Sequence, residues 1–401
     1  MRGTLPPTGM DADAMDSLER YARGKLADLE AKSLKRALSE TARFPAGVTR
    51  RDGREMISFC CNDYLDLSHH PKVIEATIDA TRKYGAGSGA SRLVTGNHPL
   101  YAELETRLAR FKETEAAVVF GSGYLTNLGI IPSLIGKGDL ILADELCHAC
   151  LFAGSQLSRA RLEIFRHNDL AHCEDLLETH RGAHARCMIL TDGVFSMDGD
   201  LAPVAALAEL AERHDAWLMT DDAHGLGVVA GGKGSSFIGG TKARVPLQMG
   251  TLSKAVGVYG GYLCASRAVV DFIKTRARSF IYTTGLPPGA VAASIAALEL
   301  IATDEALVAR PVENARLFTR ALNLPDPESC IVPLLLGEPE TALAASRSLA
   351  DQGFLVTAIR PPTVPPGTAR LRFTFTAEHR RDDILRLADA VRPFRPAGAA
   401  A

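Results

Sequence analysis

Lys254 is the residue whose type and surroundings point most directly to covalent chemistry. It follows the apolar residues 245–249 and lies in the run Thr-Leu-Ser-Lys-Ala-Val-Gly at positions 251–257. The pattern predicts a lysine that leaves the end of a strand and enters a loop where its amine is accessible but poorly solvated. Such an amine titrates toward neutrality and can condense with the carbonyl group of a substrate or of an aldehyde cofactor. A lone lysine is more often a solvated surface residue, so this interpretation depends on a second cluster.

That second cluster lies upstream, in the run Asp-Asp-Ala-His-Gly at positions 221–225. Asp221 falls at the carboxyl end of the apolar residues 217–219, where ligands of open α/β sheets bind. A carboxylate there can pair with a protonated pyridine nitrogen and keep the ring an electron sink, and His224 can donate to the phenolic oxygen of the same ring. A structural Asp-Asp turn with a backbone-bonded histidine is the alternative. Together with Lys254, the cluster favours a pyridoxal phosphate site.

A phosphate monoester needs backbone amides at a helix amino terminus. The run Gly-Ser-Gly-Tyr at positions 121–124 provides this arrangement between an apolar segment and a helical one. The same glycines could serve only a tight strand-to-helix turn. Thr251 and Ser253 are hydroxyl candidates for the same anion.

Positioning these residues requires a sheet, and the chain has the pattern of one. Short apolar runs alternate with helical segments over residues 169–180 and 203–214, which predicts a mainly parallel sheet covered by helices. The expected strands are residues 117–120, 140–142, 187–190, 217–219 and 260–265. Towards the carboxyl end the pattern changes: strands over 330–335 and 370–375 accompany helices over 340–352 and 378–391. This change predicts a smaller α+β part.

The 401 residues exceed one simple core, so we expect two domains of the α/β and α+β classes. We predict an amino-terminal arm over residues 1–60, a large cofactor-binding domain over 61–304 and a small domain over 305–396. Within the arm, residues 1–13 are expected to be disordered and residues 15–38 to form an amphipathic helix.

Composition excludes several classes of partner. The formal net charge of −2 gives no electrostatic reason to expect nucleic acid or an anionic membrane. No apolar stretch approaches the roughly 20 residues that span a bilayer, and the amino terminus lacks a secretory signal. Cys147 and Cys150 form a C-x-x-C pair, but no partner pair follows at zinc-like spacing. We therefore predict no metal site, structural cysteines and a reducing, cytoplasmic location.

Several ordered motifs resemble the α-oxoamine synthases, pyridoxal-phosphate enzymes of the aspartate-aminotransferase fold. They are the runs at 221–225 and 251–254 and the run Val-Phe-Ser-Met-Asp-Gly-Asp at 194–200. Two further stretches, residues 62–71 and 359–372, resemble the members that condense L-alanine with a pimeloyl thioester in biotin synthesis. The resemblance covers about residues 62–379. It implies fold type I, with a mainly parallel seven-stranded sheet.

The resemblance also implies roles around the cofactor. Gly123 and Tyr124 would bind the phosphate through their amides, and Ser196 would contact a cofactor oxygen. His148 would stack on the pyridine ring, although without the resemblance a capped or packed histidine is the better interpretation. Thr283 and Thr284 would reach the phosphate of a neighbouring subunit, which implies a homodimer with two shared active sites.

Substrate contacts are implied in the same way. The guanidinium of Arg360, restrained by the two prolines that follow it, could bind the amino-acid carboxylate, and Asn62 and Thr363 would be further substrate contacts. Ser88 belongs to a glycine-rich loop expected to line the substrate cavity. Near the amino terminus the chain departs from the family: a gapless alignment places Thr41 where an arginine usually receives the acyl carboxylate. Arg36 and Arg43 are near, so recognition of the acyl tail stays open.

The implied reaction is a decarboxylative condensation in which Lys254 first holds the cofactor and then acts as the base at Cα of alanine. The acyl donor would be pimeloyl-CoA or a pimeloyl-acyl carrier protein. The nearest alternatives are the glycine-using 5-aminolevulinate synthase and 2-amino-3-ketobutyrate CoA ligase. An aminotransferase is a further alternative. A cofactor-binding scaffold without catalytic activity is an alternative from a different functional class.

Overall fold

The computed structural model describes residues 16–31 and 34–395, and the contacts of the chain divide it into two compact units. The first unit comprises residues 1–42 and 50–54, and the second comprises residues 43–49 and 55–401. In the first unit, helix α1 spans Ser17–Ala31 and none of its residues is buried. The helix expected over 15–38 is therefore shorter than predicted, because residues 34–40 have no regular structure. The disorder expected for residues 1–13 concerns residues outside the described part.

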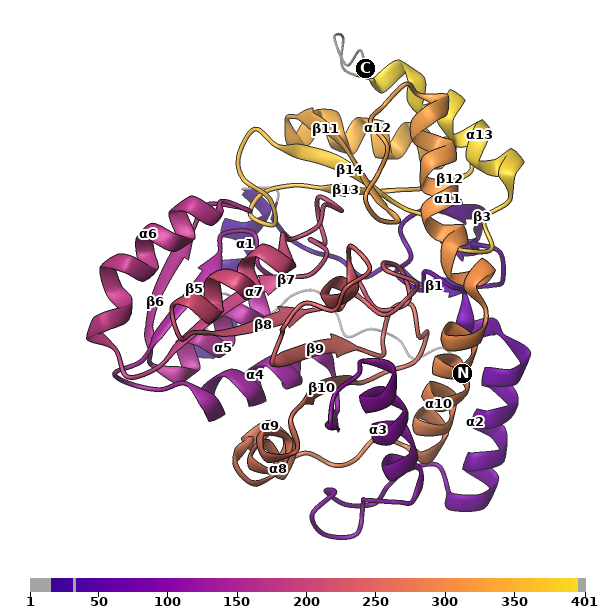
Figure 1. Cartoon of the computed structure of the whole chain (residues 1–401). Helices are drawn as coiled ribbons and strands as arrows, with labels where there is room; N and C mark the ends of the chain where they lie inside the picture. The colour runs from indigo at the N-terminus through magenta and orange to yellow at the C-terminus, as the bar shows by residue number, and fades with distance from the viewer. Residues whose placement is uncertain (1–15, 32–33, 396–401) are drawn as a thin grey trace. The chain divides into compact units, whose positions relative to one another are not determined.

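A seven-stranded sheet forms the centre of the second unit (Figure 1), in the order β4-β10-β9-β8-β7-β5-β6. Its strands are β4 (Ala116–Phe120), β5 (Leu140–Asp144), β6 (Arg161–Phe165), β7 (Cys187–Asp192), β8 (Trp217–Asp221), β9 (Leu247–Thr251) and β10 (Gly261–Ala265). The pairs β5–β6, β5–β7, β7–β8 and β8–β9 are parallel, whereas β10 runs antiparallel to both of its neighbours. All five strands expected in this region are present, and the mainly parallel sheet is confirmed.

Helices cover both faces of this sheet because its inner strands are apolar on both sides. One face packs against α4 (Gly123–Leu134), α5 (Ala149–Ser158), α8 (Arg267–Arg276) and α9 (Arg278–Ile281). The other face packs against α3 (Leu100–Phe111), α6 (Leu170–His180), α7 (Val204–Arg213) and α10 (Pro288–Thr303), and α10 in turn packs on α2 (Pro71–Tyr84). Short 3-10 helices span Leu67–His69, Arg181–Ala183, Ser235–Phe237 and Arg392–Phe394.

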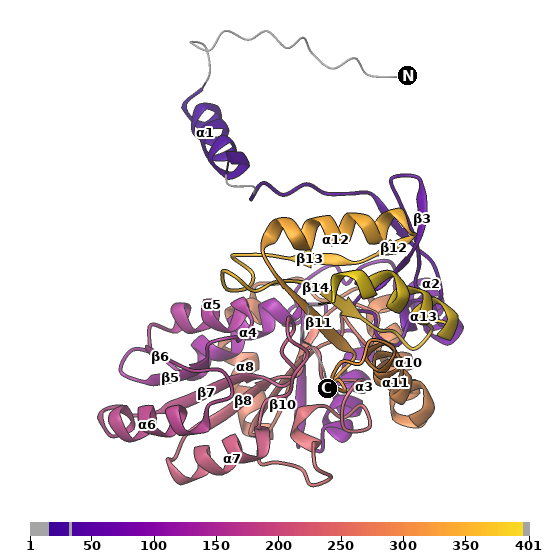
Figure 2. The ribbon, with the colours of Figure 1, turned by 90° about the horizontal axis from the view of Figure 1, so that it is seen from above.

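The carboxyl-terminal part has a smaller antiparallel sheet in the order β11-β14-β13 (Figure 2). Its strands are β11 (Ile331–Gly337), β13 (Thr357–Ile359) and β14 (Ala369–Thr374). Helices α11 (Glu305–Ala321), α12 (Pro339–Asp351) and α13 (Arg381–Val391) pack on it through one hydrophobic cluster. The predicted smaller α+β part is thereby confirmed, whereas the limits 61–304 and 305–396 stay predictions.

Further short strands are β1 (Thr41–Arg43), β2 (Val48–Arg51), β3 (Arg54–Ser58) and β12 (Phe354–Leu355). Strand β12 pairs in parallel with β3, with Phe354 opposite Ile57. Within residues 16–31 and 34–395, no helix is both long enough and apolar enough to cross a membrane.

Candidate active site

A cavity of about 200 Å³ lies where several parallel strands end. Because β7, β8 and β9 run the same way, their carboxyl ends meet at one edge of the sheet, and α4 begins beside them. Eight of the predicted site residues line the cavity: Gly123, Tyr124, His148, Asp221, His224, Thr251, Ser253 and Lys254. The lining includes four further residues that were not predicted from the sequence: Cys150, Asp192, Ala223 and Met249.

Asp221 ends β8 and is only 4% exposed. Its Oδ2 accepts a hydrogen bond from Asn127 Nδ2 at 2.8 Å, and its Oδ1 accepts one from the Ala223 amide at 2.9 Å. Asn127 comes from α4 and is fully buried. The carboxylate is therefore held in a fixed orientation by an amide that the sequence analysis missed.

Asp192 ends β7, directly opposite Asp221 in the parallel register. It accepts a hydrogen bond from the His148 amide at 3.2 Å. Burial, and then repulsion by Asp221, hold the pKa of Asp192 well above its usual value. The pair therefore favours one ionised and one protonated carboxyl group.

His148 precedes α5, and its Nδ1 accepts a hydrogen bond from the Cys150 amide at 3.2 Å. The same nitrogen lies 2.7 Å from Cys150 Sγ. Burial lowers the pKa of His148, with Asp221 opposing and Lys254 adding to the effect. His148 therefore caps α5, in agreement with the interpretation made without the family resemblance. Its neutral ring also lines the cavity.

His224 is buried, and its Nδ1 lies 2.6 Å from the Tyr64 hydroxyl. Burial, followed by the positive charges of Lys254 and Arg372, holds the pKa of His224 well below its usual value. The imidazole is therefore neutral at pH 7. It can serve as a hydrogen-bonding group without adding charge to the cavity.

Lys254 lies three residues beyond the end of β9 and is partly buried. Burial lowers the pKa of its amine, and the carboxylates of Asp221 and Asp192 oppose this shift. A lowered pKa increases the fraction of free amine at neutral pH. Lys254 can therefore act as a nucleophile and as a base.

The amino terminus of α4 forms another side of the cavity. The Ser122 hydroxyl caps the helix by accepting a hydrogen bond from the Leu125 amide at 3.2 Å. A Cβ atom on Gly123 would lie 3.3 Å from Thr251 Cβ, so any larger residue there would press on the Thr251 side chain. The Thr251 hydroxyl lies 3.2 Å from Ser253 Oγ. Backbone amides and two hydroxyls thus surround a space suited to an anion.

Arg372, in β14, is a further charged group that the sequence analysis did not select. It is 6% exposed and donates to the Ser196 carbonyl and, at 3.3 Å, to Asn62 Oδ1. Asn62 Oδ1 also accepts from the Tyr64 hydroxyl at 3.2 Å. Because the charge of Arg372 lowers the pKa of both His224 and Lys254, it lies within electrostatic reach of the cavity.

Six other predicted residues are not among those that line the cavity in the described chain: Asn62, Ser88, Ser196, Thr283, Thr284 and Arg360. Thr363 is likewise absent from the lining, and its amide donates to the Arg360 carbonyl in a turn after β13. Ser88 donates to the Gly285 carbonyl at 2.6 Å, and Thr284 forms an isolated bridge with Ser91. A Cβ atom on Gly121 would lie 3.7 Å from Thr283 Cγ2, which places Thr283 beside the start of the phosphate loop.

Three residues were considered for binding the carboxylate of the acyl substrate: Arg36, Thr41 and Arg43. Arg43 forms an ion pair with Asp63 at 3.0 Å. Thr41 accepts a hydrogen bond from Arg51 Nε at 2.9 Å, and Thr41 and Arg36 belong to the first unit. Asp63 also belongs to a group with Asp66 and His69 whose ligand atoms lie within 4.8 Å of one another, and none of these three residues lines the cavity.

A model of the class I and II aminotransferases matches residues 54–391. The 8-amino-7-oxononanoate synthase of Methylocella silvestris is 64% identical over 342 residues, 85% of this chain and 97% of that protein. That of Beijerinckia indica is 59% identical over 385 residues, 96% of this chain and all of that protein. The chain belongs to this family, among its 8-amino-7-oxononanoate synthases. The resemblance drawn from the motifs is thereby confirmed.

Solved structures agree with this assignment. The serine palmitoyltransferase of Sphingomonas wittichii has a TM-score of 0.86 and 28% identity, and the match covers 94% of this chain and 98% of that chain. A serine palmitoyltransferase from S. paucimobilis with bound PLP has a TM-score of 0.84 at 28% identity, with the same coverage. The 8-amino-7-oxononanoate synthase of Francisella tularensis has a TM-score of 0.72 and 27% identity, covering 84% of this chain and 97% of that chain. Fold type I is confirmed for this member of the family.

Proposed function

We propose that this chain is an acyltransferase that condenses L-alanine with a pimeloyl thioester in biotin synthesis. The products are 8-amino-7-oxononanoate, carbon dioxide and the free thiol. The observation that carries the proposal is that Lys254, Asp221 and His148 line one cavity. Relatives that are named for this product and match nearly their full length support the substrate assignment.

Pyridoxal phosphate is the cofactor, and the cavity residues fit its three functional parts. The buried carboxylate of Asp221, oriented by Asn127, suits a protonated pyridine nitrogen. The helix terminus at Gly123 and the hydroxyl of Thr251 suit the phosphate, because the missing Cβ leaves space between them. Lys254 supplies the amine for the aldehyde.

Bound there, pyridoxal phosphate supplies an electron sink for the electron pair left when a bond at the amino-acid Cα breaks. Lys254 removes and returns the proton at Cα, for which its lowered pKa suits it. Asp221 would hold the cofactor at its pyridine nitrogen and keep that nitrogen protonated by ion pairing. His148 would cover the pyridine ring with a neutral imidazole, and His224 would bind the phenolic oxygen by a hydrogen bond.

The carboxylate of alanine needs a cationic partner, and two arginines are candidates. Arg372 is supported by its bond to Asn62 and by the effect of its charge on Lys254. Arg360, with Thr363, is supported by the family motif alone. Kinetics of Arg372→Lys and Arg360→Lys separate them: the variant with the larger rise in the KM for alanine identifies the ligand, since a lysine cannot reproduce the bidentate fork.

We also propose a homodimer with two shared active sites in the reducing cytoplasm. Thr283 and Thr284 lie in the segment that resembles the one reaching a neighbouring subunit, and the adjacent Tyr282 is 73% exposed. All eight cysteines are free thiols, which fits a reducing compartment. Light scattering after size-exclusion chromatography tests the assembly, and a single-chain mass at micromolar concentration would contradict it.

Product identification tests the function. Purified holoenzyme is mixed with alanine, glycine or serine and with pimeloyl-CoA or a pimeloyl-carrier protein, and the products are identified by mass spectrometry. The proposal expects 8-amino-7-oxononanoate and free thiol with alanine. Turnover confined to glycine would indicate a glycine-using synthase. Release of a keto acid would indicate an aminotransferase, and no turnover despite bound cofactor would indicate a scaffold.

A further inference from the structure

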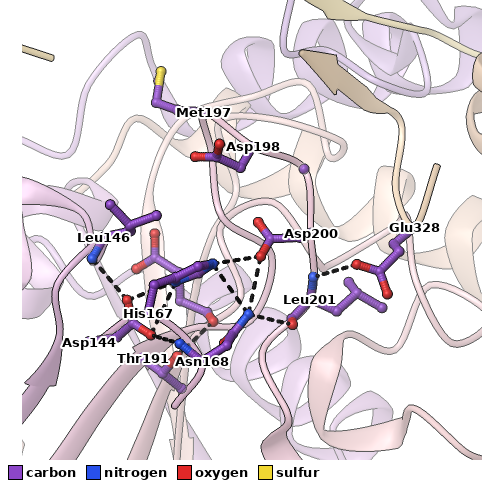
Figure 3. A network of polar contacts seen from close by, with 12 residues as sticks. Asp144, Leu146, His167, Asn168, Thr191, Met197, Asp198, Asp200, Leu201 and Glu328 are labelled. Atoms are coloured by element: carbon purple, nitrogen blue, oxygen red, sulfur yellow. Dashed lines mark hydrogen bonds and ion pairs between the residues drawn. The ribbon is translucent and has the colours of Figure 1, made fainter. Parts of the chain in front are cut away.

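His167, which follows β6, lies between two carboxylates outside the cavity lining (Figure 3). Its Nδ1 is 3.0 Å from Asp144 Oδ1, and its Nε2 is 2.7 Å from Asp200 Oδ2. An ionised carboxylate only accepts hydrogen bonds, so a ring that bonds one at each nitrogen carries a proton on both. Burial alone would lower the pKa of His167, but the bonds to Asp144 and Asp200 raise it to about 10. The ring is therefore an imidazolium at neutral pH.

Asp144 lies at the root of the loop that leads to His148. It ends β5, is fully buried, and accepts hydrogen bonds from the amides of Leu146 and Asn168, both at 2.8 Å. The bond to Leu146 shapes the turn that runs from the strand to His148. One side of the imidazolium therefore fixes the loop that places the ring-covering histidine.

Asp200 ends a second loop, residues 195–200, which is closed by the bond from the Phe195 amide to the Asp200 carbonyl at 3.0 Å. The Phe195 ring packs edge-on against His167 at a centroid distance of 4.4 Å. Both arginines of β14 contact this loop. Arg372 donates a hydrogen bond to the Ser196 carbonyl, and Arg370 forms an ion pair with Asp198. The other side of the imidazolium therefore fixes the loop that holds Arg372.

Asn168 forms a second bridge between the same two loops. Its amide donates to Asp144 Oδ2, and its Nδ2 donates to Asp200 Oδ2 at 3.1 Å and to the Leu201 carbonyl at 3.2 Å. Its φ of 54° lies in the left-handed region, which asparagine tolerates better than most residues. Two successive residues thus join one loop to the other, as Figure 3 shows.

We propose that His167 is a positioning residue: it fixes the loop of His148 relative to the loop of Arg372, and so sets the spacing between the cofactor-covering side and the carboxylate-binding side of the site. This inference rests on the proposed function, with Arg372 as the ligand of the alanine carboxylate. It assigns to His167 an effect on the binding of cofactor and amino acid that packing alone would not produce.

The test compares three variants as holoenzymes. His167→Phe keeps an aromatic ring against Phe195 but loses both bonds. Asp200→Asn keeps the shape of the side chain and removes one negative charge beside His167. It replaces His167→Phe as the test variant if His167→Phe does not fold. His180→Gln is the matched control, because His180 also pairs with a carboxylate, Glu163 at 3.8 Å, but lies at the opposite end of α6.

Three quantities are measured: the Kd for pyridoxal phosphate, the induced circular dichroism of the bound cofactor, and the KM for alanine separately from kcat. We expect His167→Phe to raise the KM for alanine about 10- to 100-fold, the range for losing a hydrogen bond to a charged group. The cofactor dichroism should decrease and kcat should change much less. Asp200→Asn should shift the same quantities in the same direction, and His180→Gln should leave them unchanged.

The inference is wrong if wild type turns over alanine and folded His167→Phe and Asp200→Asn match it in all three quantities. It is also wrong if His180→Gln produces the same changes. If wild type itself binds the cofactor but makes no product from alanine, the proposed function fails, while the Kd and dichroism still decide the role of His167.

Discussion

At the scale of single residues, burial shifts the acid–base behaviour of the cavity in a consistent way. It lowers the pKa of Lys254, His148 and His224 and raises that of Asp192. Each shift disfavours the charged form, as expected where water is scarce. The two histidines are therefore uncharged at neutral pH. A larger fraction of Lys254 is in the free-amine form than for a lysine on the surface.

Replacing Lys254 by alanine should abolish covalent attachment of pyridoxal phosphate. It should also lower turnover by on the order of a thousandfold or more, because both the nucleophile and the base are lost. Visible absorption and mass spectrometry after borohydride reduction check the attachment. Lys137→Ala, at an exposed lysine, should retain both properties. Persistence of the attached cofactor in Lys254→Ala would contradict the assignment.

Replacing Asn127 by alanine removes the donor to Asp221 Oδ2 and leaves a buried carboxylate oxygen without that partner. We expect the Kd for pyridoxal phosphate to rise roughly tenfold or more, as for other lost bonds to charged groups. Fluorescence titration measures it. Asn314→Ala, which removes a similar amide donor from α11 to the Thr376 carbonyl, should leave the Kd unchanged. Equal effects in the two variants would refute a specific role for Asn127.

The sequence identified Lys254, Asp221 and His224 because each lies at or just beyond the end of an apolar run. It missed Asn127, Asp192 and Arg372, which come from α4, β7 and β14. Asp192 faces Asp221 only because β7 and β8 are neighbours in parallel register. A single amino-acid sequence does not show which strands are neighbours in the sheet, so residues that reach the site through tertiary contacts cannot be predicted from it.

At the scale of elements, predicted and observed strands agree where both faces are buried. Strand β6 was missed because Arg161 and Glu163 interrupt its apolar pattern at the edge of the sheet. The three-residue strand β13 was also missed, since its pairing with β14 rather than its composition defines it. The end of α1 was placed too late because a helical periodicity continued in residues that do not form a helix.

Strand β10 begins against the amino terminus of α4, which makes Gly261 sensitive to substitution. A Cβ atom on Gly261 would lie 2.7 Å from the Gly123 nitrogen, closer than real Cβ contacts. Gly261→Ala should therefore displace the phosphate-binding turn and weaken pyridoxal phosphate binding by about tenfold or more. Gly182→Ala, where nothing lies within 4 Å of the new atom, is the control. Unchanged affinity in folded Gly261→Ala would show that the turn adapts.

At the scale of the whole molecule, His379 links segments from both ends of the second unit. Its Nε2 lies 2.9 Å from the Ser58 carbonyl, its Nδ1 accepts from the Thr376 amide at 3.0 Å, and its ring stacks on Phe59 at 4.1 Å. Burial lowers the pKa of His379 to about 4. The folded protein therefore keeps this imidazole neutral under conditions in which an unfolded chain would protonate it.

Acidification should destabilise the fold through His379. Between about pH 6.5 and pH 4 the unfolded chain binds a proton that the folded chain excludes, so the free energy of unfolding falls as pH falls, by up to roughly 3 kcal/mol. Urea unfolding at pH 7 and pH 5 measures the loss. His379→Gln should be less stable at pH 7 but should lose less on acidification. An identical loss in wild type and variant would exclude His379 as the cause.

Arg372 lies in β14, the last strand within the described residues, whereas its partner Asn62 lies more than 300 residues earlier. All strands of the large sheet have already left the ribosome when β14 is still to be synthesised. A nascent chain at that stage has the lysine, the paired carboxylates and the anion-binding turn, but it lacks the guanidinium of Arg372. Where Arg372 is the ligand of alanine, the amino-acid-binding side of the enzyme is therefore the last part to be synthesised.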